Sequence, residues 1–399
     1  MATDHLAERQ PKSTGPATEA FNRADVTLSN WRTTPYSRWS FQNVSEIIPS
    51  AVIAGSRAAR PQPAPVALSS LATVEFADTD GVTRTLADFL TTSETDELVV
   101  MRAGTIVAEW STAHSDPSRP HIIFSVSKSL TGLLAGILAG KGLLSFDKLI
   151  GEYVPEVAGS AYADATVQQL FDMEISSKFV EDYLDSSGGF ERYRRATRWN
   201  PDIPGDPAPD LSSFLCGIGK GDGPHGDKHA YRSPNTDLAG IVLERAAGVR
   251  FASLMSNELW KPMGAVSGAM VTVDRIGTAR AAGGISTAPR DLALVGDLVR
   301  RQGGGVVPAR FVSDLWSRSR RGAWAKGDQL ELFPEGSYRN YWYETGNGEL
   351  AAIGIHGQWI WIHPETETVI VKLSSQTLPV DPALDHAIIR MMRAICAAA

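Results

Sequence analysis

The sequence predicts an α+β fold in which one antiparallel sheet, built from both ends of the chain, is flanked by helices. Three observations lead to this expectation. A β-hairpin pattern lies in the first third of the chain, the middle is dominated by helical segments, and strand patterns return near the end, before a last amphipathic helix. We therefore expect a sheet domain over residues 26–146 and 275–399, with a helical domain inserted over residues 147–274.

Strand patterns occur in both parts of the expected sheet domain. The runs that we expect to form strands are residues 98–102, 105–110, 351–363 and 368–374. Gly104 supplies the turn of the first hairpin, and the two later runs are expected to form a second hairpin. The closing helix is expected over residues 382–397.

The inserted region combines short helices with long loops. Helical patterns occur at residues 166–173, 235–248 and 251–260. The segment 185–230 is rich in glycine and proline, so we expect it to form loops.

The segment that precedes the first hairpin has three parts. Residues 1–25 are rich in Thr, Ala, Pro and charge and are expected to be disordered. Aromatic residues over 31–53 predict an arm that packs on the body of the protein. The Pro-rich stretch 60–65 predicts a stiff, extended connector.

The composition excludes several classes of function. The 399 residues are 43% hydrophobic and carry a net charge of −7, which favours neither nucleic acid nor an anionic membrane surface. No run approaches the roughly 18 apolar residues of a membrane span, and residues 1–16 lack the apolar run of a signal peptide, so we expect a cytoplasmic protein. Cys216 and Cys396 do not predict a disulfide framework or a zinc site. No cofactor is expected, and a homodimer is left open.

The stretch around Ser125 predicts a nucleophile at the start of a helix. Residues 127–141 favour a helix, and Gly142 can end it. Positions i and i+3 share a helix face, so Lys128 is expected to lie over Ser125. Burial or a nearby cation can lower the pKa of a lysine until it can take a proton from a serine hydroxyl. The N–H groups at the helix start suit a developing oxyanion.

A Ser-x-x-Lys pattern alone is also compatible with a serine that only caps a helix. The chain contains a second copy, Ser145-x-x-Lys148, which we expect to cap the next short helix. The residues that accompany Ser125 decide between these interpretations.

Tyr231 follows a glycine-rich loop and precedes an apolar helix. A nearby lysine can ease the loss of the phenolic proton, so Tyr231 can move a proton between Ser125 and a leaving group. Ser233 or Asn235 can orient Lys128 or cap the helix. The alternative is that Tyr231 is a packing residue and Asn235 an N-cap.

Residues 354–358 predict a strand edge that can pass close to Ser125. Acyl transfer needs two oxyanion donors, and one is the backbone N–H of Ser125. Glycines at 354 and 357 permit the close approach of a second N–H. The alternative is a core strand with a glycine bulge.

Together these motifs resemble those of the penicillin-recognising serine hydrolases. The matching motifs, in order, are Ser125-Val126-Ser127-Lys128, Tyr231-x-Ser233-x-Asn235 and Ile355-His356-Gly357. That family includes class C β-lactamases, D-alanyl-D-alanine carboxypeptidases and related esterases, and the 6-aminohexanoate-dimer hydrolases are similar in more detail. Further similar strings are Tyr153-Val154-Pro155-Glu156, Glu181-Asp182-Tyr183 and Val369-Ile370-Val371-Lys372.

The resemblance implies the β-lactamase/D,D-peptidase-like fold and a set of roles. It implies that Ser125 is acylated, that Lys128 and Tyr231 handle its proton, and that the N–H groups of Ser125 and Ile355 form the oxyanion hole. The substrate-contacting positions that it implies are Phe179, Ser233, Asn235, Ala282, His356 and Gly357.

Two of these positions depart from the pattern of the 6-aminohexanoate-dimer hydrolases. Phe179 stands where a tyrosine contacts the substrate amide, and a phenyl ring cannot donate that hydrogen bond. Ala282 stands where an asparagine or histidine tunes amide activity. The acidic residue that favours the amino end of the dimer has no clear counterpart over 185–195.

Other motifs predict no chemistry. For His225-Gly226-Asp227-Lys228-His229 we favour a solvated loop over a metal site. The glycines of 221–226 lack the strand that precedes a dinucleotide fingerprint, and we expect this loop to deliver Tyr231. The late aromatic residues are expected to be mainly core, and they are Trp324, Tyr341, Trp342, Tyr343, Trp359 and Trp361.

The sequence therefore predicts a serine hydrolase that forms an acyl-enzyme on Ser125. Its expected substrate is a small carboxylic ester or a linear amide such as a 6-aminohexanoate oligomer. The alternatives are a β-lactamase or D,D-peptidase-type activity, or a non-catalytic homologue that binds a ligand in the same cleft.

Overall fold

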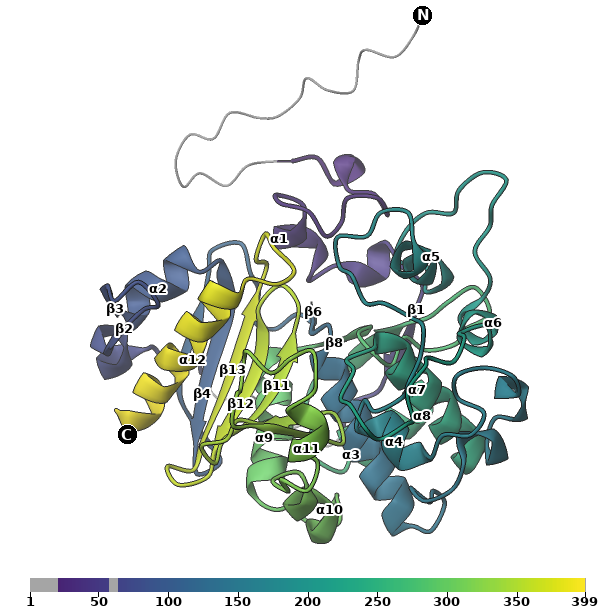
Figure 1. Cartoon of the computed structure of the whole chain (residues 1–399). Helices are drawn as coiled ribbons and strands as arrows, with labels where there is room; N and C mark the ends of the chain where they lie inside the picture. Colours follow the sequence, from purple (N-terminus) through teal and green to yellow (C-terminus); the bar gives the residue numbers. More distant parts are fainter. Residues whose placement is uncertain (1–20, 57–63, 399) are drawn as a thin grey trace, which may run out of the picture.

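A computed structural model describes residues 21–56 and 64–398. Its main element is a seven-stranded antiparallel sheet in the order β5-β4-β13-β12-β11-β10-β9 (Figure 1). The strands are β4 (Thr95–Arg102), β5 (Thr105–Ser111), β9 (Ser337–Arg339), β10 (Trp342–Glu344), β11 (Leu350–Gly354), β12 (Gln358–His363) and β13 (Thr368–Ser374). Early β4 pairs with late β13, with Val100 opposite Ile370, so both ends of the chain build one sheet as predicted.

Helices cover both faces of this sheet. The long helix α12 (Pro382–Ala397) crosses one face, and α9 (Pro289–Arg300) packs on the other (Figure 1). Every residue of β13 is consequently buried. A Cβ added to Gly296 of α9 would lie 2.4 Å from the side chain of Val369, so this helix lies directly against the sheet. The closing helix has the predicted bounds, with Asp381 accepting the Leu384 N–H at its start.

A second, four-stranded antiparallel sheet was not anticipated from the sequence. Its order is β1 (Ser50–Ile53), β7 (Ala269–Thr272), β8 (Ile285–Thr287) and β6 (His121–Ile122). Strands of two to four residues are too short to produce a readable alternation. β7 lies inside the region 147–274 that was expected to be helical. The sheet matters for function because β6 runs directly into Ser125.

The middle of the chain contains the predicted helices and two more. They are α4 (Val167–Phe171), α5 (Gly189–Ala196), α6 (Leu211–Cys216), α7 (Ser233–Ala247), α8 (Phe251–Leu254) and the π-helix η6 (Met255–Trp260). The expectation of loops throughout 185–230 is wrong, because α5 and α6 lie there. The side chain of Asp210 caps α6 by accepting the N–H of Ser213. The division into a sheet domain and an inserted domain stays a prediction.

Shorter elements complete the described residues. The helices are α1 (Ser37–Ser40), α2 (Leu86–Thr92), α10 (Ala309–Asp314) and α11 (Arg321–Trp324), and β2 (Glu75–Ala77) pairs with β3 (Thr83–Thr85). The 3-10 helices are η1 (Arg23–Asp25), η2 (Val44–Glu46), η3 (Ser69–Thr73), η4 (Ile150–Glu152) and η5 (Pro155–Val157). Within the two described ranges, no helix combines the length and apolar character needed to span a bilayer.

Two local expectations are corrected. The run 351–363 is not one strand, because His356 (φ +60°) and Gly357 (φ +82°) form a turn between β11 and β12. Ser145 caps no helix, since a turn follows it and the next helix, η4, has Leu149 as its N-cap.

The N-terminal arm packs on the body as predicted. Trp31 is fully buried, and its ring stacks on Phe124 at a centroid distance of 6.2 Å. The expected tail and connector lie mostly outside the described residues. Where the description begins, Asn22 caps the 3-10 helix Arg23–Asp25, so the end of the expected tail is ordered.

Candidate active site

Ser125 lies at the junction of β6 and the central helix α3 (Val126–Gly140). The Ile123 N–H donates to the Ile285 carbonyl at 2.9 Å, which ties this junction to β8. Phe124 then takes a positive φ of +41°, which turns the chain sharply into the helix. Ser125 is only partly buried, whereas the residues from Val126 to Leu138 are all buried. The fold therefore presents one accessible hydroxyl at the start of a buried helix.

Lys128 makes the contact with Ser125 that the i, i+3 spacing predicts. Its Nζ lies 2.7 Å from Ser125 Oγ and 2.8 Å from the carbonyl oxygen of Ala282. Burial lowers the pKa of Lys128 to about 7; the charge of Glu181 raises this pKa, and that of Arg280 lowers it further. A large fraction of Lys128 is consequently neutral near pH 7 and can accept a proton from Ser125.

A buried charge network holds the peptide that anchors Lys128. Asp237 Oδ1 accepts the N–H of Ala282 at 2.8 Å, and Oδ2 accepts the phenol of Tyr193 at 2.6 Å. The same carboxylate forms an ion pair with Arg280. Ala282 thus contributes its backbone to the site. Asp237 and Arg280 are functional candidates that sequence reasoning missed, although Asp237 lies two residues after the Tyr231-x-Ser233-x-Asn235 motif.

Tyr231 lies next to both residues, as predicted, but its protonation differs from the expectation. Lys128 Nζ is 4.9 Å from the centre of the Tyr231 ring, and the phenol is in hydrogen-bonding reach of Ser125. Burial and the charge of Glu181 raise the pKa of Tyr231 above its ordinary value. The expectation of an easily lost proton is therefore wrong, because burial outweighs the hydrogen bond to Ser125 and the charge of Arg280, which lower this pKa. Tyr231 stays protonated and can act as a proton donor.

The end of β11 passes directly beside the nucleophile. A Cβ added to Gly354 would lie 2.6 Å from the carbonyl oxygen of Ile123 and 3.0 Å from the nitrogen of Ser125. Only glycine permits this approach without displacing backbone. The next residue is Ile355, whose role as second oxyanion donor stays a prediction.

His356 and Gly357 form the turn that follows. The Nδ1 atom of His356 lies 2.6 Å from the carbonyl oxygen of Gln376, and its ring packs on Phe124 at 5.3 Å. Burial lowers the pKa of His356 to about 4, so the imidazole is neutral. A Cβ on Gly357 would meet the Gln376 side chain at 2.4 Å. Both residues shape the turn, and their contact with substrate stays a prediction.

Ser233 and Asn235 do not orient Lys128. The hydroxyl of Ser233 donates to Glu181 Oε1 at 2.6 Å, and Asn235 Oδ1 accepts the phenol of Tyr162 at 3.2 Å. Neither side chain caps α7, whose N-cap residue is Arg232. Both earlier interpretations are wrong because the two side chains face other partners.

Phe179 is packed among aromatic side chains. It is 7% exposed, and its neighbours are Phe190, Tyr193 and Phe214. Close by in the sequence, the partly exposed Tyr183 donates its phenol to Glu181 Oε1 at 2.8 Å. Glu181 and Tyr183 are thus site candidates that the sequence interpretation passed over in favour of Phe179. The signal was present, since both belong to a string on which the resemblance rests.

The remaining motifs lie elsewhere. His225 accepts the Ser176 N–H and contacts Asp164, whereas His229 is buried against Trp324. The loop is solvated at the exposed residues Asp227 and Lys228, as expected, but it is buried at His229, and it leads into Tyr231. The six late aromatic residues are all buried, as predicted.

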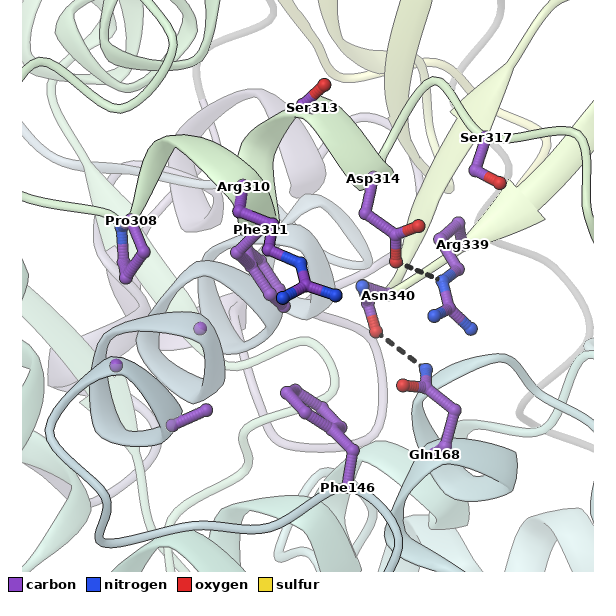
Figure 2. Close-up of a pocket in the computed structure, with 13 residues that line it drawn as sticks. Phe146, Gln168, Pro308, Arg310, Phe311, Ser313, Asp314, Ser317, Arg339 and Asn340 are labelled. Carbon is purple, nitrogen blue, oxygen red and sulfur yellow. Dashed lines mark hydrogen bonds and ion pairs between the residues drawn. The ribbon is translucent and has the colours of Figure 1, made fainter.

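A cavity of about 860 Å³ lies beside the far half of α3 and does not include Ser125, Lys128 or Tyr231 (Figure 2). Gly136 and the stacked rings of Phe146 and Phe311 contribute to its wall. Several of its polar side chains pair with one another, as Figure 2 shows for Arg339 with Asp314 and for Gln168 with Asn340. It is therefore separate from the chemistry at Ser125.

Comparison with known proteins places these observations in context. Residues 84–391 match the model of the Beta-lactamase family. The chain is 38% identical over 359 residues to a 6-aminohexanoate-dimer hydrolase of Paenarthrobacter ureafaciens, and the match covers 88% of each chain.

Solved structures share the fold. A protein of Bacillus anthracis, provisionally assigned as a 6-aminohexanoate-dimer hydrolase, matches with a TM-score of 0.86 and 23% identity over 94% of this chain and 98% of its own. A family VIII carboxylesterase matches with a TM-score of 0.56 and 14% identity over 77% of this chain and 95% of its own.

Proposed function

The chain belongs to the beta-lactamase family and is a serine hydrolase of the amide- and ester-cleaving type, and from this premise we propose that Ser125 is its acylated nucleophile and Lys128 the base. The observation that carries the proposal is the position of Lys128. Its Nζ lies 2.7 Å from Ser125 Oγ, with a pKa that burial lowers to about 7. A lysine with an ordinary pKa would be protonated and could not take the serine proton.

In the proposed acylation step, neutral Lys128 takes the Ser125 proton while Oγ attacks the substrate carbonyl. The oxyanion that forms is stabilised by the backbone N–H groups of Ser125 and Ile355. Tyr231 donates its phenolic proton to the departing nitrogen or oxygen and recovers a proton from Lys128. The bond from Oγ to the acyl carbon forms, the bond to the leaving group breaks, and no proton is lost overall.

In the deacylation step, water replaces the leaving group. Neutral Lys128 takes a proton from that water, and the hydroxide adds to the acyl carbon. The tetrahedral intermediate collapses with return of the proton to Ser125 and release of the carboxylic acid.

We further propose that the substrate is a small linear amide, such as a 6-aminohexanoate oligomer, or a small carboxylic ester. The relative from Paenarthrobacter ureafaciens supports the amide. Phe179 lies in an aromatic cluster, so its missing hydroxyl does not count against amide cleavage. Tyr183 is only partly buried, and its phenol oxygen can accept the N–H of a substrate amide while its own proton is donated to Glu181.

The test is covalent labelling followed by mass spectrometry. Wild-type protein treated with a fluorophosphonate should gain one adduct, and Ser125→Ala should gain none. Ser145→Ala is the matched control, because it removes the serine of the second Ser-x-x-Lys pattern and should label fully. Hydrolysis of the linear 6-aminohexanoate dimer and of p-nitrophenyl acetate is measured on the same samples. A folded wild type that neither labels nor turns over would contradict the catalytic role of Ser125.

A further inference from the structure

Two arginines, Arg32 and Arg194, form no ion pair with a carboxylate in the described part of the chain. Arg32 donates to the carbonyl of Trp199 at 3.0 Å and to Asn200 Oδ1 at 2.5 Å. Arg194 donates to the carbonyls of Tyr183 at 2.6 Å and Asp185 at 3.3 Å. Both side chains are only partly buried. Each guanidinium has five N–H donors, so several remain for another acceptor.

The contacts of both arginines connect them to residues that adjoin Ser125. The Arg32 guanidinium lies 4.8 Å from the ring of Trp31 and 5.8 Å from that of Trp199. These two indoles flank Phe124, which immediately precedes Ser125. Besides burial, the positive charges of Arg32 and Arg194 both lower the pKa of His356, the residue that follows Ile355.

Arg194 approaches the site from α5. It donates to the backbone of Tyr183, whose phenol reaches Glu181. Burial lowers the pKa of Arg32, and the positive charge of Arg194 lowers it further.

The nearby acids are already engaged. Asp237 pairs with Arg280, and Glu181 accepts the hydroxyls of Ser233 and Tyr183. Two further acids are also occupied, since Asp185 accepts backbone N–H groups of its own turn and Glu191 pairs with Arg195. Burial lowers the pKa of Arg194 and the negative charges of Asp185 and Glu181 raise it, but neither acid forms an ion pair with it. A carboxylate ligand would therefore supply the direct partner that a partly desolvated guanidinium favours.

We propose that Arg32 and Arg194 bind a carboxylate of the substrate, so that the protein selects acid-bearing esters or amides over neutral ones. This inference rests on the proposed hydrolase function and adds the substrate class to it. Guanidinium groups suit the planar, bidentate recognition of a carboxylate. The segment 185–195 lacks a clear counterpart of the acidic residue that would bind the amino end of a 6-aminohexanoate dimer. It contributes the cation Arg194 instead.

The experiment compares matched pairs of substrates. On the acyl side, p-nitrophenyl hydrogen glutarate is compared with p-nitrophenyl valerate. On the leaving side, the N-valeryl amide of 6-aminohexanoate is compared with N-hexylvaleramide. The wild type should favour the acidic member of at least one pair in kcat/KM by about tenfold or more, and salt should weaken this preference.

The variants test whether the two arginines cause the preference. Arg32→Gln and Arg194→Gln should each lower the acidic-to-neutral ratio of kcat/KM about tenfold, and Arg32→Lys should retain more of it than Arg32→Gln. Arg310→Gln is the matched control, because Arg310 is exposed beside the separate 860 Å³ cavity, and it should leave the ratio unchanged. No preference in either wild-type pair, or an equal loss for both members of a pair, would overturn the proposal.

A failure of the hydrolase function is recognised separately. If Ser125 does not label and no substrate turns over, binding of 6-acetamidohexanoate to the Ser125→Ala protein is measured by calorimetry. Binding that Arg32→Gln weakens about tenfold supports the carboxylate site, and absent or unchanged binding overturns it.

Discussion

Asp237 and Ala282 share a hydrogen bond that connects a buried ion pair to Lys128. The carboxylate accepts the Ala282 N–H at 2.8 Å, and the carbonyl of the same residue accepts a hydrogen bond from Lys128 Nζ at 2.8 Å. The network therefore fixes the position of residue 282, and with it the direction of the amine toward Ser125. This relationship explains why an alanine can stand here, since the backbone makes the contacts.

Asp237→Asn tests this relationship. The asparagine oxygen can still accept the Ala282 N–H, but the negative charge is lost. That charge raises the pKa of Lys128, so its loss should lower this pKa and move the acid limb of kcat/KM to lower pH. Leaving the buried Arg280 unpaired should cost about 3–5 kcal/mol in the free energy of unfolding. Rate profiles and denaturant titrations measure the two effects.

Arg280→Met supplies the opposite change. The charge of Arg280 lowers the pKa of Lys128, so its loss should move the acid limb to higher pH. In the Asp237→Asn/Arg280→Met double variant both charges are absent, and the limb should return toward that of the wild type. Single variants with an unchanged limb would show that the ion pair does not tune Lys128.

The wild-type profile is itself a prediction. Because the reactive form of Lys128 is neutral, kcat/KM should fall about tenfold per pH unit below a pKa of about 7 and level off above it. Tyr231 acts in its protonated form and its pKa is raised, so it should add no descending limb near neutrality. The control is Lys372→Met, since burial also lowers the pKa of Lys372 to about 7 but this lysine contacts Ser374 on β13. The Lys372→Met variant should therefore keep the acid limb of the kcat/KM profile.

The sequence was most informative where local rules dominate. The spacing of Ser125 and Lys128 placed both on one turn of α3, and the glycine at 104 marked the turn of a hairpin. These features depend on residues close in sequence, so the pattern carries them.

The features that sequence reasoning missed depend on burial and distant contacts. The protonation of Tyr231 is set by desolvation, which no local pattern reports. The network of Asp237 and Arg280 joins residues 43 positions apart. The run 351–363 resembles a single strand in the sequence, since most of its residues are apolar and are buried in the structure. The turn at His356 divides this run, and the positive φ of that residue is not visible in the pattern.

Tyr231→Phe should affect substrates according to their leaving groups. The proposed role of the phenol is to protonate the departing atom, which an amine needs and p-nitrophenolate does not. We expect kcat to fall about 10²–10⁴-fold for the linear amide and much less for the p-nitrophenyl ester. Equal losses on both substrates would instead assign Tyr231 to positioning of Ser125. Retained fluorophosphonate labelling would show that the nucleophile is intact.

Gly354→Ala tests whether the close passage of β11 beside Ser125 matters for turnover. The added methyl group would meet the Ile123 carbonyl oxygen at 2.6 Å and the Ser125 nitrogen at 3.0 Å, and both are backbone atoms that cannot rotate away. The strand must therefore shift and carry the Ile355 N–H with it. Losing one oxyanion donor costs about 10²–10³ in kcat. Gly322→Ala is the matched control, because its added methyl group meets nothing within 4 Å. If Gly354→Ala folds and keeps full kcat, the edge of β11 does not supply the second donor.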